Sequence, residues 1–341
     1  MKAPEESIDC LVVKALKADS GYLSGEGLAK KLKISRQAFW KHINNLIDKG
    51  YDIAAAPHLG YRLISSPDKL YPEEIKSGLN TKFIGKEVYH YQSLDSTQSL
   101  VWKLGLEGQE EGFVVFAETQ KKGKGRMQRK WISPSGGIYL SLLLRPKFLS
   151  LDEVSQISLV ISLACVRAIK QATGIECQVK WPNDIVLAEK KIGGILCEIN
   201  AETDRIHFLV VGIGININST NLPSEATSLL LNAKLKFSRL DIAKMILREI
   251  ESCYLKAQSY GFRTLLEEWS RLCFLWGRRL RVKILERTIE GEAQGIDERG
   301  YLLLRDNNGL VVKVSAGDIV KVNSLSKTLL EERERDKERE G

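Results

Sequence analysis

The stretch Glu118–Trp131, ETQKKGKGRMQRKW, joins two hydrophobic segments and carries a high density of charge. Six of the ten residues from 121 to 130 are Lys or Arg, and Gly123 and Gly125 lie among them. Glycine lets the backbone approach a ligand closely, and clustered cations form charge-assisted hydrogen bonds with carboxylate or phosphate. The flanking segments, Phe113–Ala117 and Ile138–Leu144, have the pattern of buried strands. The stretch is therefore predicted to be a mobile anion-binding loop between two core strands, although a solvated surface loop has the same composition.

Length and composition limit the class of protein. The 341 residues suffice for two or three domains at about 100–200 residues each. The net charge of +8 is compatible with a nucleic acid or nucleotide partner but does not require one. The first ten residues lack the apolar core of a signal peptide, and the longest apolar run, 157–169, is shorter than a membrane span. We therefore expect a cytoplasmic protein with no membrane partner.

The six cysteines give no sign of a disulfide framework or a metal site. None of them belongs to a Cys-x-x-Cys pair, and the four histidines lie at no metal-ligand spacing to them. Reduced and mostly buried thiols are expected.

The first 65 residues are predicted to form a winged helix-turn-helix domain. Apolar residues recur at helical spacing in Ile8–Lys17, and a second short helix follows Ser24. Ser35 is suited to cap a third helix, which Gly50 ends. A turn at 57–60 then joins two short strands, which form the wing. The two strands are Tyr51–Ile53 and Tyr61–Ile64.

The third helix of such a motif enters the major groove of DNA. The segment 26–41 carries five Lys or Arg and one acid, an excess that suits phosphate contacts. The residues predicted to be buried on this helix are Ala38, Phe39, Ile43, Leu46 and Ile47. The residues predicted to contact DNA lie on its other side and at its start: Ser35, Arg36, Gln37, Trp40 and Lys41. A small helical domain that binds another protein is the alternative.

Residues 66–274 are predicted to form a domain of the α+β class, a mixed sheet with helices on one face. Its segment Ser96–Gln98 offers small polar groups, or a helix cap, at the junction between a strand and a helix. Paired glycines at 193–194 and at 212 and 214 imply close approach of another group to two strands. The predicted strands are Val88–Tyr91, Phe113–Ala117, Ile138–Leu144, Gln178–Trp181, Ile185–Leu187, Ile192–Ile199 and Ile206–Ile217. The predicted helices are Leu70–Leu79, Ser99–Leu104, Val154–Thr173, Leu240–Tyr260 and Phe262–Leu272, and a tight turn is predicted at Glu189–Lys191.

Residues 275–323 are predicted to form a small β-barrel. Its strands are Arg279–Glu286, Ile289–Asp297, Tyr301–Asp306 and Leu310–Ser315, with turns at Gly291, 298–300 and 307–309. The Asn-Gly pair at 308–309 is a strong hairpin signal. The charged segment 324–341 is predicted to be a disordered tail.

Five short motifs follow one another behind the predicted winged helix. They are Asp95-Ser96-Thr97, Gln120 with Gly123–Arg126 and Arg129–Trp131, Lys180–Asp184, Lys191 with Gly193–Leu196, and Gly212–Asn216. Each motif alone is weak, but all five in this order and spacing are specific. On these motifs the chain, over residues 8–322, resembles the bifunctional biotin protein ligases that also repress the biotin operon.

This resemblance implies an enzyme that joins biotin to ATP as biotinoyl-5′-AMP, with Mg²⁺, and then transfers biotin to a lysine. The acceptor would be the biotin carboxyl carrier protein of acetyl-CoA carboxylase. The resemblance also implies repression of biotin synthesis genes at operator DNA, with biotinoyl-AMP promoting a homodimer. The C-terminal domain would be SH3-like. A lipoate ligase-like enzyme and a regulator without ligase activity are the alternatives.

The resemblance assigns roles to particular residues. Lys191, Arg126 and Asp184 would be catalytic, and Asp184 would either hold Mg²⁺ or orient Lys191. The residues that would bind biotin are Ser96, Thr97, Gln98, Gln120, Gly123, Lys124, Gly125, Arg126, Lys191 and Gly194. The residues that would bind ATP or the adenylate are Lys124, Arg126, Arg129, Trp131, Asn183, Lys191 and Asn216.

The chain departs from the family pattern at two places. Gln98 stands where the family often has Asn, and in the basic loop Lys124, Met127 and Gln128 replace Arg, Arg and Gly. The departures affect side chains more than the backbone of the loop. They bear on loop ordering, retention of the intermediate and dimer contacts, to which this loop contributes in the family.

Overall fold

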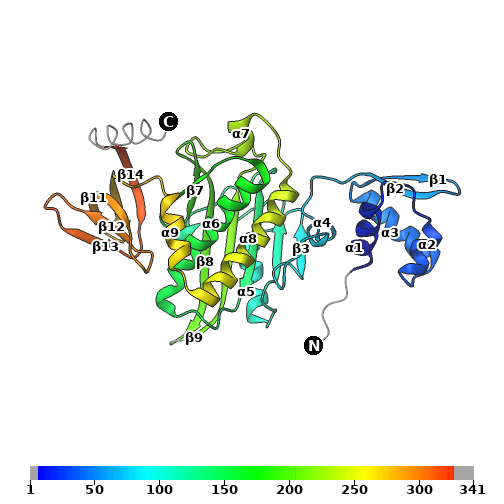
Figure 1. The fold of residues 1–341 in the computed structure, drawn as a ribbon, viewed down its shortest axis with the longest axis horizontal. Helices are drawn as coiled ribbons and strands as arrows, with labels where there is room; N and C mark the ends of the chain where they lie inside the picture. The colour runs from blue at the N-terminus through cyan, green and yellow to red at the C-terminus, as the bar shows by residue number, and fades with distance from the viewer. Residues whose placement is uncertain (1–6, 204, 326–341) are drawn as a thin grey trace.

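The structure is a computed structural model that describes residues 7–203 and 205–325, with side chains to residue 322. Three parts lie in a row (Figure 1): helices and a hairpin at one end, a large sheet with helices in the centre, and a small sheet at the other end. The predicted charged tail at 324–341 lies outside the described residues from 326 onward. No helix in the described ranges is long and apolar enough to cross a lipid bilayer.

The N-terminal part consists of three helices and a hairpin. Each helix begins at a serine whose hydroxyl accepts a hydrogen bond from the first turn: Ser7, Ser24 and Ser35. The predicted burial of Ile47 is wrong, because this residue lies at the edge of the apolar stripe of the third helix and is 43% exposed. The elements are α1 Ile8–Ala18, α2 Gly25–Lys31, α3 Arg36–Asp48, β1 Asp52–Ala56 and β2 Gly60–Ser65.

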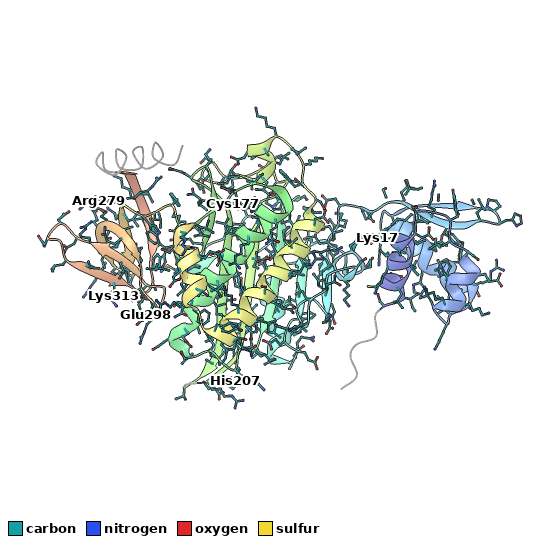
Figure 2. All side chains as sticks on the ribbon, viewed as in Figure 1. Lys17, Cys177, His207, Arg279, Glu298 and Lys313 are labelled. Atoms are coloured by element: carbon teal, nitrogen blue, oxygen red, sulfur yellow. The ribbon has the colours of Figure 1, made fainter. Side chains whose placement is uncertain are left out.

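The N-terminal part docks on the central part through a short helix, α4 Pro72–Lys76. Lys49 at the end of α3 lies 2.9 Å from the buried carboxylate of Glu73. Lys17 of α1 pairs with the buried carboxylate of Glu74, and Figure 2 shows Lys17 on the side of α1 that faces the central part. Buried ion pairs add little net stability, but breaking one is costly, so they favour a single arrangement. The predicted helix Leu70–Leu79 is shorter than expected.

The central sheet has seven strands in the order β3-β4-β5-β9-β8-β7-β6. Only β3 and β4 are parallel, so the sheet is mixed, as predicted. The strands are β3 Val88–Tyr91, β4 Val114–Ala117, β5 Ile138–Leu144, β6 Gln178–Lys180, β7 Asp184–Leu187, β8 Lys190–Glu202 and β9 Arg205–Ile215. Lys191, predicted in a tight turn, lies in β8, because the left-handed residues of the turn are Ala188 and Glu189.

Helices cover both faces of this sheet, not one as predicted. The helices α6 Val154–Thr173 and α8 Arg239–Tyr260 lie side by side on one face (Figure 1), and α9 Arg263–Arg271 packs on α6. On the opposite face, α5 Thr97–Leu106 packs on alternate residues of the strands through a second apolar cluster. A short helix, α7 Leu229–Ala233, was not predicted.

The C-terminal part is a five-stranded antiparallel sheet in the order β13-β12-β11-β10-β14. The predicted turn at Gly291 is wrong, because this glycine lies within β11 opposite Leu280. A side chain at Gly291 would come within 2.7 Å of the carbonyl oxygen of Arg305 on the next strand. The strands are β10 Arg278–Ile284, β11 Arg287–Ile296, β12 Leu302–Arg305, β13 Val311–Val314 and β14 Asp318–Leu325, the last of them not predicted.

Candidate active site

On the sheet face that α5 covers, the side chains change from large to small along the strands. Under α5 the inward residues are large, such as Leu143 and Val210. Two residues further along the same strands they become Ser141 opposite Gly212, and on the next strand Gly194 lies opposite Gly214. Small residues leave space that a helix does not fill, and a cavity of about 390 Å³ opens there. Ligand pockets of enzymes commonly have this size.

Every ligand-site residue predicted from the sequence lines this cavity except Gly123. The carbonyl of Gly123 instead accepts a hydrogen bond of 2.9 Å from the amide of Trp131. A side chain at Gly123 would come within 2.4 Å of the carbonyl oxygen of Trp131. Gly123 therefore shapes the loop and does not face the cavity.

One end of the cavity is a chain of neutral hydrogen-bonding groups. The Oε1 atom of Gln120 accepts hydrogen bonds from the amide and the hydroxyl of Thr97, at 2.9 and 3.1 Å. The hydroxyl of Thr97 lies 2.9 Å from that of Ser141, which donates to Oε1 of Gln98 at 3.0 Å. Ser96 caps α5 and lines the same end. These groups suit a neutral polar ring of a ligand.

The floor of the cavity is free of side chains beneath one aromatic ring. A Cβ atom at Gly214 would lie 2.5 Å from the indole of Trp131, and one at Gly194 would lie 3.4 Å from it. Among the residues that the structure describes, the indole Nε1 of Trp131 and the Oδ1 of Asn216 are buried without hydrogen-bond partners. Buried polar atoms are normally paired, so these two atoms lack the partners that such burial usually requires.

The other end of the cavity is strongly cationic. Lys191 Nζ lies 2.6 Å from Asp184 Oδ1 and 5.3 Å from the centre of the Trp131 ring. Arg126 Nη1 donates to Asn183 Oδ1 at 3.4 Å. Burial lowers the pKa of the Arg126 guanidinium, although nearby carboxylates raise it. A cation that is partly shielded from solvent interacts more strongly with an anion than it would in bulk water.

The backbone of the basic loop pairs with itself. Lys124 and Lys130 pair as an antiparallel bridge, and the amide of Gly125 donates to the carbonyl of Arg129 at 2.7 Å. Met127 and Gln128 at its tip have positive φ angles of 50° and 60°. The loop therefore folds back on itself and presents both arginines, Arg126 and Arg129, toward the C-terminal sheet.

The sequence did not reveal several cavity residues. Asp318 of β14 pairs with Arg129 and lies 3.9 Å from Arg126, a contact across 189 residues that no local pattern could indicate. Ser141 had a local signal, because it interrupts the apolar run of β5. Lys180 belongs to the motif Lys180–Asp184 but was assigned no role from the sequence. It lines the cavity and is the cross-strand partner of Asp184.

An ionic cluster around the buried Arg239 and Glu118 ties the segment after the hairpin to the central sheet. Arg239 Nε bonds Asp68 at 3.1 Å, and its Nη1 donates to Glu118 at 2.8 Å. His90 Nε2 lies 3.1 Å from the same carboxylate. Burial raises the pKa of Glu118, but the hydrogen bond from His90 and the charge of Arg239 prevail and lower it to about 2. Glu118 lies two residues before Gln120 of the cavity.

The predicted DNA-contacting residues occupy the start and the outer face of α3. Ser35 caps the helix through a 3.1 Å hydrogen bond from the amide of Ala38. Arg36, Gln37, Trp40 and Lys41 are all exposed, and Trp40 is 54% exposed. This face of α3 is therefore accessible to a partner such as DNA, although a single exposed aromatic residue is ordinary on a protein surface.

Three family models match the chain in sequence order. The HTH domain matches residues 11–62, the Biotin/lipoate A/B protein ligase family matches 90–216, and the Biotin protein ligase C terminal domain matches 276–322. These ranges fall on the N-terminal, central and C-terminal parts, and they confirm the predicted α+β organisation.

Relatives are similar over most of the chain. The bifunctional ligase/repressor BirA of Bacillus subtilis is 38% identical over 309 residues, which cover 89% of this chain and 94% of that protein. The protein of the same description from Escherichia coli is 31% identical over 311 residues, 89% of this chain and 94% of that protein. The biotin protein ligase of Aquifex aeolicus, solved with biotin and ATP, is 29% identical with a TM-score of 0.62, covering 70% of this chain and 99% of that one. The chain therefore belongs to the biotin protein ligase family, among the bifunctional ligase/repressor proteins.

Proposed function

We propose that this chain is an ATP-dependent biotin protein ligase that also represses biotin synthesis genes. The observation that carries the proposal is a single cavity with neutral hydrogen-bonding groups at one end and a cationic cluster at the other. Biotin has a neutral ureido ring and a carboxylate, so it matches the two ends in order. The enzyme forms biotinoyl-5′-AMP and pyrophosphate and then passes biotin to a lysine of a biotin carboxyl carrier protein.

The neutral end would bind the ureido ring through Ser96, Thr97 and Gln120, with Gln98 fixed behind them by a 3.0 Å hydrogen bond to the carbonyl of Val210. Ser141 links Thr97 to Gln98 and so sets the direction of both side chains. A polar ligand that fails to match such groups leaves them unpaired, which is the physical basis of discrimination against analogues.

The cationic end would carry the chemistry. The biotin carboxylate attacks the α-phosphorus of ATP, so like charges must approach, and fixed cations offset the repulsion and stabilise charge on the phosphate oxygens. Lys191 acts as a point charge at the junction of carboxylate and phosphate, and the fork of Arg126 bridges two oxygens. Lys124 and Gly125 position Arg126 by closing the loop.

The nucleotide would lie against the floor of the cavity. Trp131 covers Gly194 and Gly214, and its ring would pack against adenine. The unpaired Oδ1 of Asn216 is the acceptor for an adenine amino group. Asn183 holds Arg126 in place, and Arg129 extends the cationic surface toward the outer phosphates.

The residues present fit one Mg²⁺ ion held together with ATP. Within residues 7–203 and 205–325 no group of three or more His, Cys, Asp or Glu is arranged to hold a metal. Mg²⁺ in nucleotide enzymes is typically held by one or two carboxylates together with substrate phosphates. Asp184, beside Lys191 in the cavity, is the carboxylate that would hold the ion, which would neutralise phosphate charge.

The ligase proposal is tested with labelled biotin, ATP and Mg²⁺, with and without a biotin carboxyl carrier domain. We expect pyrophosphate release without the carrier and stable label on the carrier when it is added. Label transfer from lipoate instead of biotin, or no pyrophosphate release with either acid, would contradict the proposal.

The repressor role rests on the N-terminal part and on a two-fold dimer. One winged helix reads one half-site, so a homodimer would read a palindromic operator. Biotinoyl-AMP would promote the dimer by binding Lys124 and Arg126, which line the cavity, and so holding Met127 and Gln128 of the basic loop in place for a second subunit. Sedimentation with and without biotin plus ATP tests this step, and an unchanged monomer–dimer constant would contradict it.

Removing residues 1–65 tests the organisation of the chain. We propose a DNA-binding domain at 1–65, a catalytic domain at 66–274, an SH3-like barrel domain at 275–323 and a charged tail at 324–341, all in the cytoplasm. The truncated protein should lose operator binding in a gel-shift assay and keep pyrophosphate release. Specific operator binding by the truncated protein would exclude this assignment.

A further inference from the structure

The walls of the cavity carry an excess of positive charge. Six cationic side chains and three anionic ones line it. Asp184 pairs with Lys191, and Asp318 pairs with the two arginines of the basic loop. Lys180 also lines the cavity, yet its ammonium group has no hydrogen-bond or ion-pair partner in the described ranges 7–203 and 205–325. Its exposure is intermediate, so burial has removed part of the water that would otherwise solvate it.

The register of the sheet places Lys180 at one end of a row of residues. Lys180 of β6 is the cross-strand partner of Asp184, which is the partner of Gly194, which is the partner of Gly214. Cross-strand partners project from the same face of a sheet. Trp131 lies over the two glycines, the Asp184–Lys191 pair follows, and Lys180 comes one strand further out.

This order matches the order of groups in a nucleoside triphosphate. When the base lies at Trp131 and the α-phosphate at Lys191, the next position along the row is that of the β- and γ-phosphates. We propose that Lys180 binds these two phosphates and holds the pyrophosphate as it leaves. The inference rests on the proposed ligase function and adds a residue to its first step.

Lys180 would act in the step that breaks the bond between the α-phosphate and pyrophosphate. A biotin carboxylate oxygen forms a bond to the α-phosphorus, and the bond from that phosphorus to the oxygen bridging to the β-phosphate breaks. The electron pair of the broken bond leaves with pyrophosphate, so negative charge grows on the leaving group and no proton is transferred. A desolvated ammonium fixed near that oxygen stabilises the growing charge more than one in water.

The second step of the reaction involves no pyrophosphate. A variant that loses only pyrophosphate binding should therefore be impaired in the first step alone, whereas a structural defect should impair both steps. Lys180→Met should raise the KM for ATP and lower kcat for pyrophosphate release, together by about 10- to 100-fold, the range for a hydrogen bond to a charged group. Transfer of biotin from synthetic biotinoyl-5′-AMP to a carrier domain should stay at the wild-type rate. In the reverse direction, the KM for pyrophosphate should rise by a similar factor.

Two further variants complete the experiment. Lys180→Arg should restore most of the first step, because it keeps the charge. Lys190→Met removes an exposed lysine of β8 that does not line the cavity, so it should leave both steps unchanged. Equal loss in both steps, or no loss in the first step, would overturn the role of Lys180. A wild-type protein that releases no pyrophosphate would instead overturn the ligase proposal itself.

Discussion

Replacing Glu118 with glutamine should destabilise the protein at neutral pH and remove part of its acid sensitivity. The carboxylate is 3% exposed, and it pairs with Arg239 at 2.8 Å and His90 at 3.1 Å. Its pKa falls from the ordinary 4.5 to about 2, because the charged partners outweigh the effect of burial. At 1.36 kcal/mol per unit, this shift corresponds to about 3 kcal/mol of stability.

The sign of the pH dependence follows from the direction of the shift. A carboxylate with a depressed pKa stabilises the folded state fully above its ordinary pKa, and the effect disappears as the pH falls toward the folded-state value. We therefore expect the difference in unfolding free energy between wild type and Glu118→Gln to be about 3 kcal/mol at pH 7 and to shrink from about pH 5 downward to pH 2. Urea unfolding at several pH values measures it. A difference that is independent of pH would refute the ionic explanation.

Three other substitutions test the site and the DNA surface. Lys191→Ala should slow pyrophosphate release by about 100-fold or more, as loss of a charge-stabilising contact does; near wild-type release would exclude a catalytic role. Gly214→Val should raise the KM for ATP, because its Cβ would lie 2.5 Å from the Trp131 ring, while DNA binding by the apo protein stays unchanged. Lys41→Ala should lower the salt dependence of operator binding by about one unit of slope, whereas Arg36→Ala should relax base specificity; titration of operator variants at several salt concentrations separates the two.

Local patterns in the sequence predicted much of the fold. The strands Val88–Tyr91 and Ile138–Leu144 and the helix Val154–Thr173 have the predicted bounds, because continuous apolar runs and helical periodicity decide them. The serine cap of the third helix, Ser35, was an equally local signal. Such elements need no knowledge of their neighbours.

The remaining features depend on which segments meet in space. Gly291 looked like a turn residue, but a neighbouring strand requires it to be small. The position of α5 on the second face of the sheet follows from the pairing of β4, β5 and β9, which the sequence does not display. Asp318 reaches the basic loop from another part of the chain. The motif residues were found by resemblance, whereas their hydrogen-bonding order, through Ser141, needed the fold.

The docking of the N-terminal part on α4 has a consequence for the spacing of an operator. Lys17 and Lys49 pair with buried carboxylates of α4, and Arg239 holds Asp68 in the segment between the hairpin and α4. The position of α3, the helix predicted to contact DNA, is therefore fixed relative to the central sheet. In a dimer formed through the central parts, that interface would set the distance between the two α3 helices. Operators with half a helical turn inserted between half-sites would then be rejected, because no flexible tether can absorb the rotation.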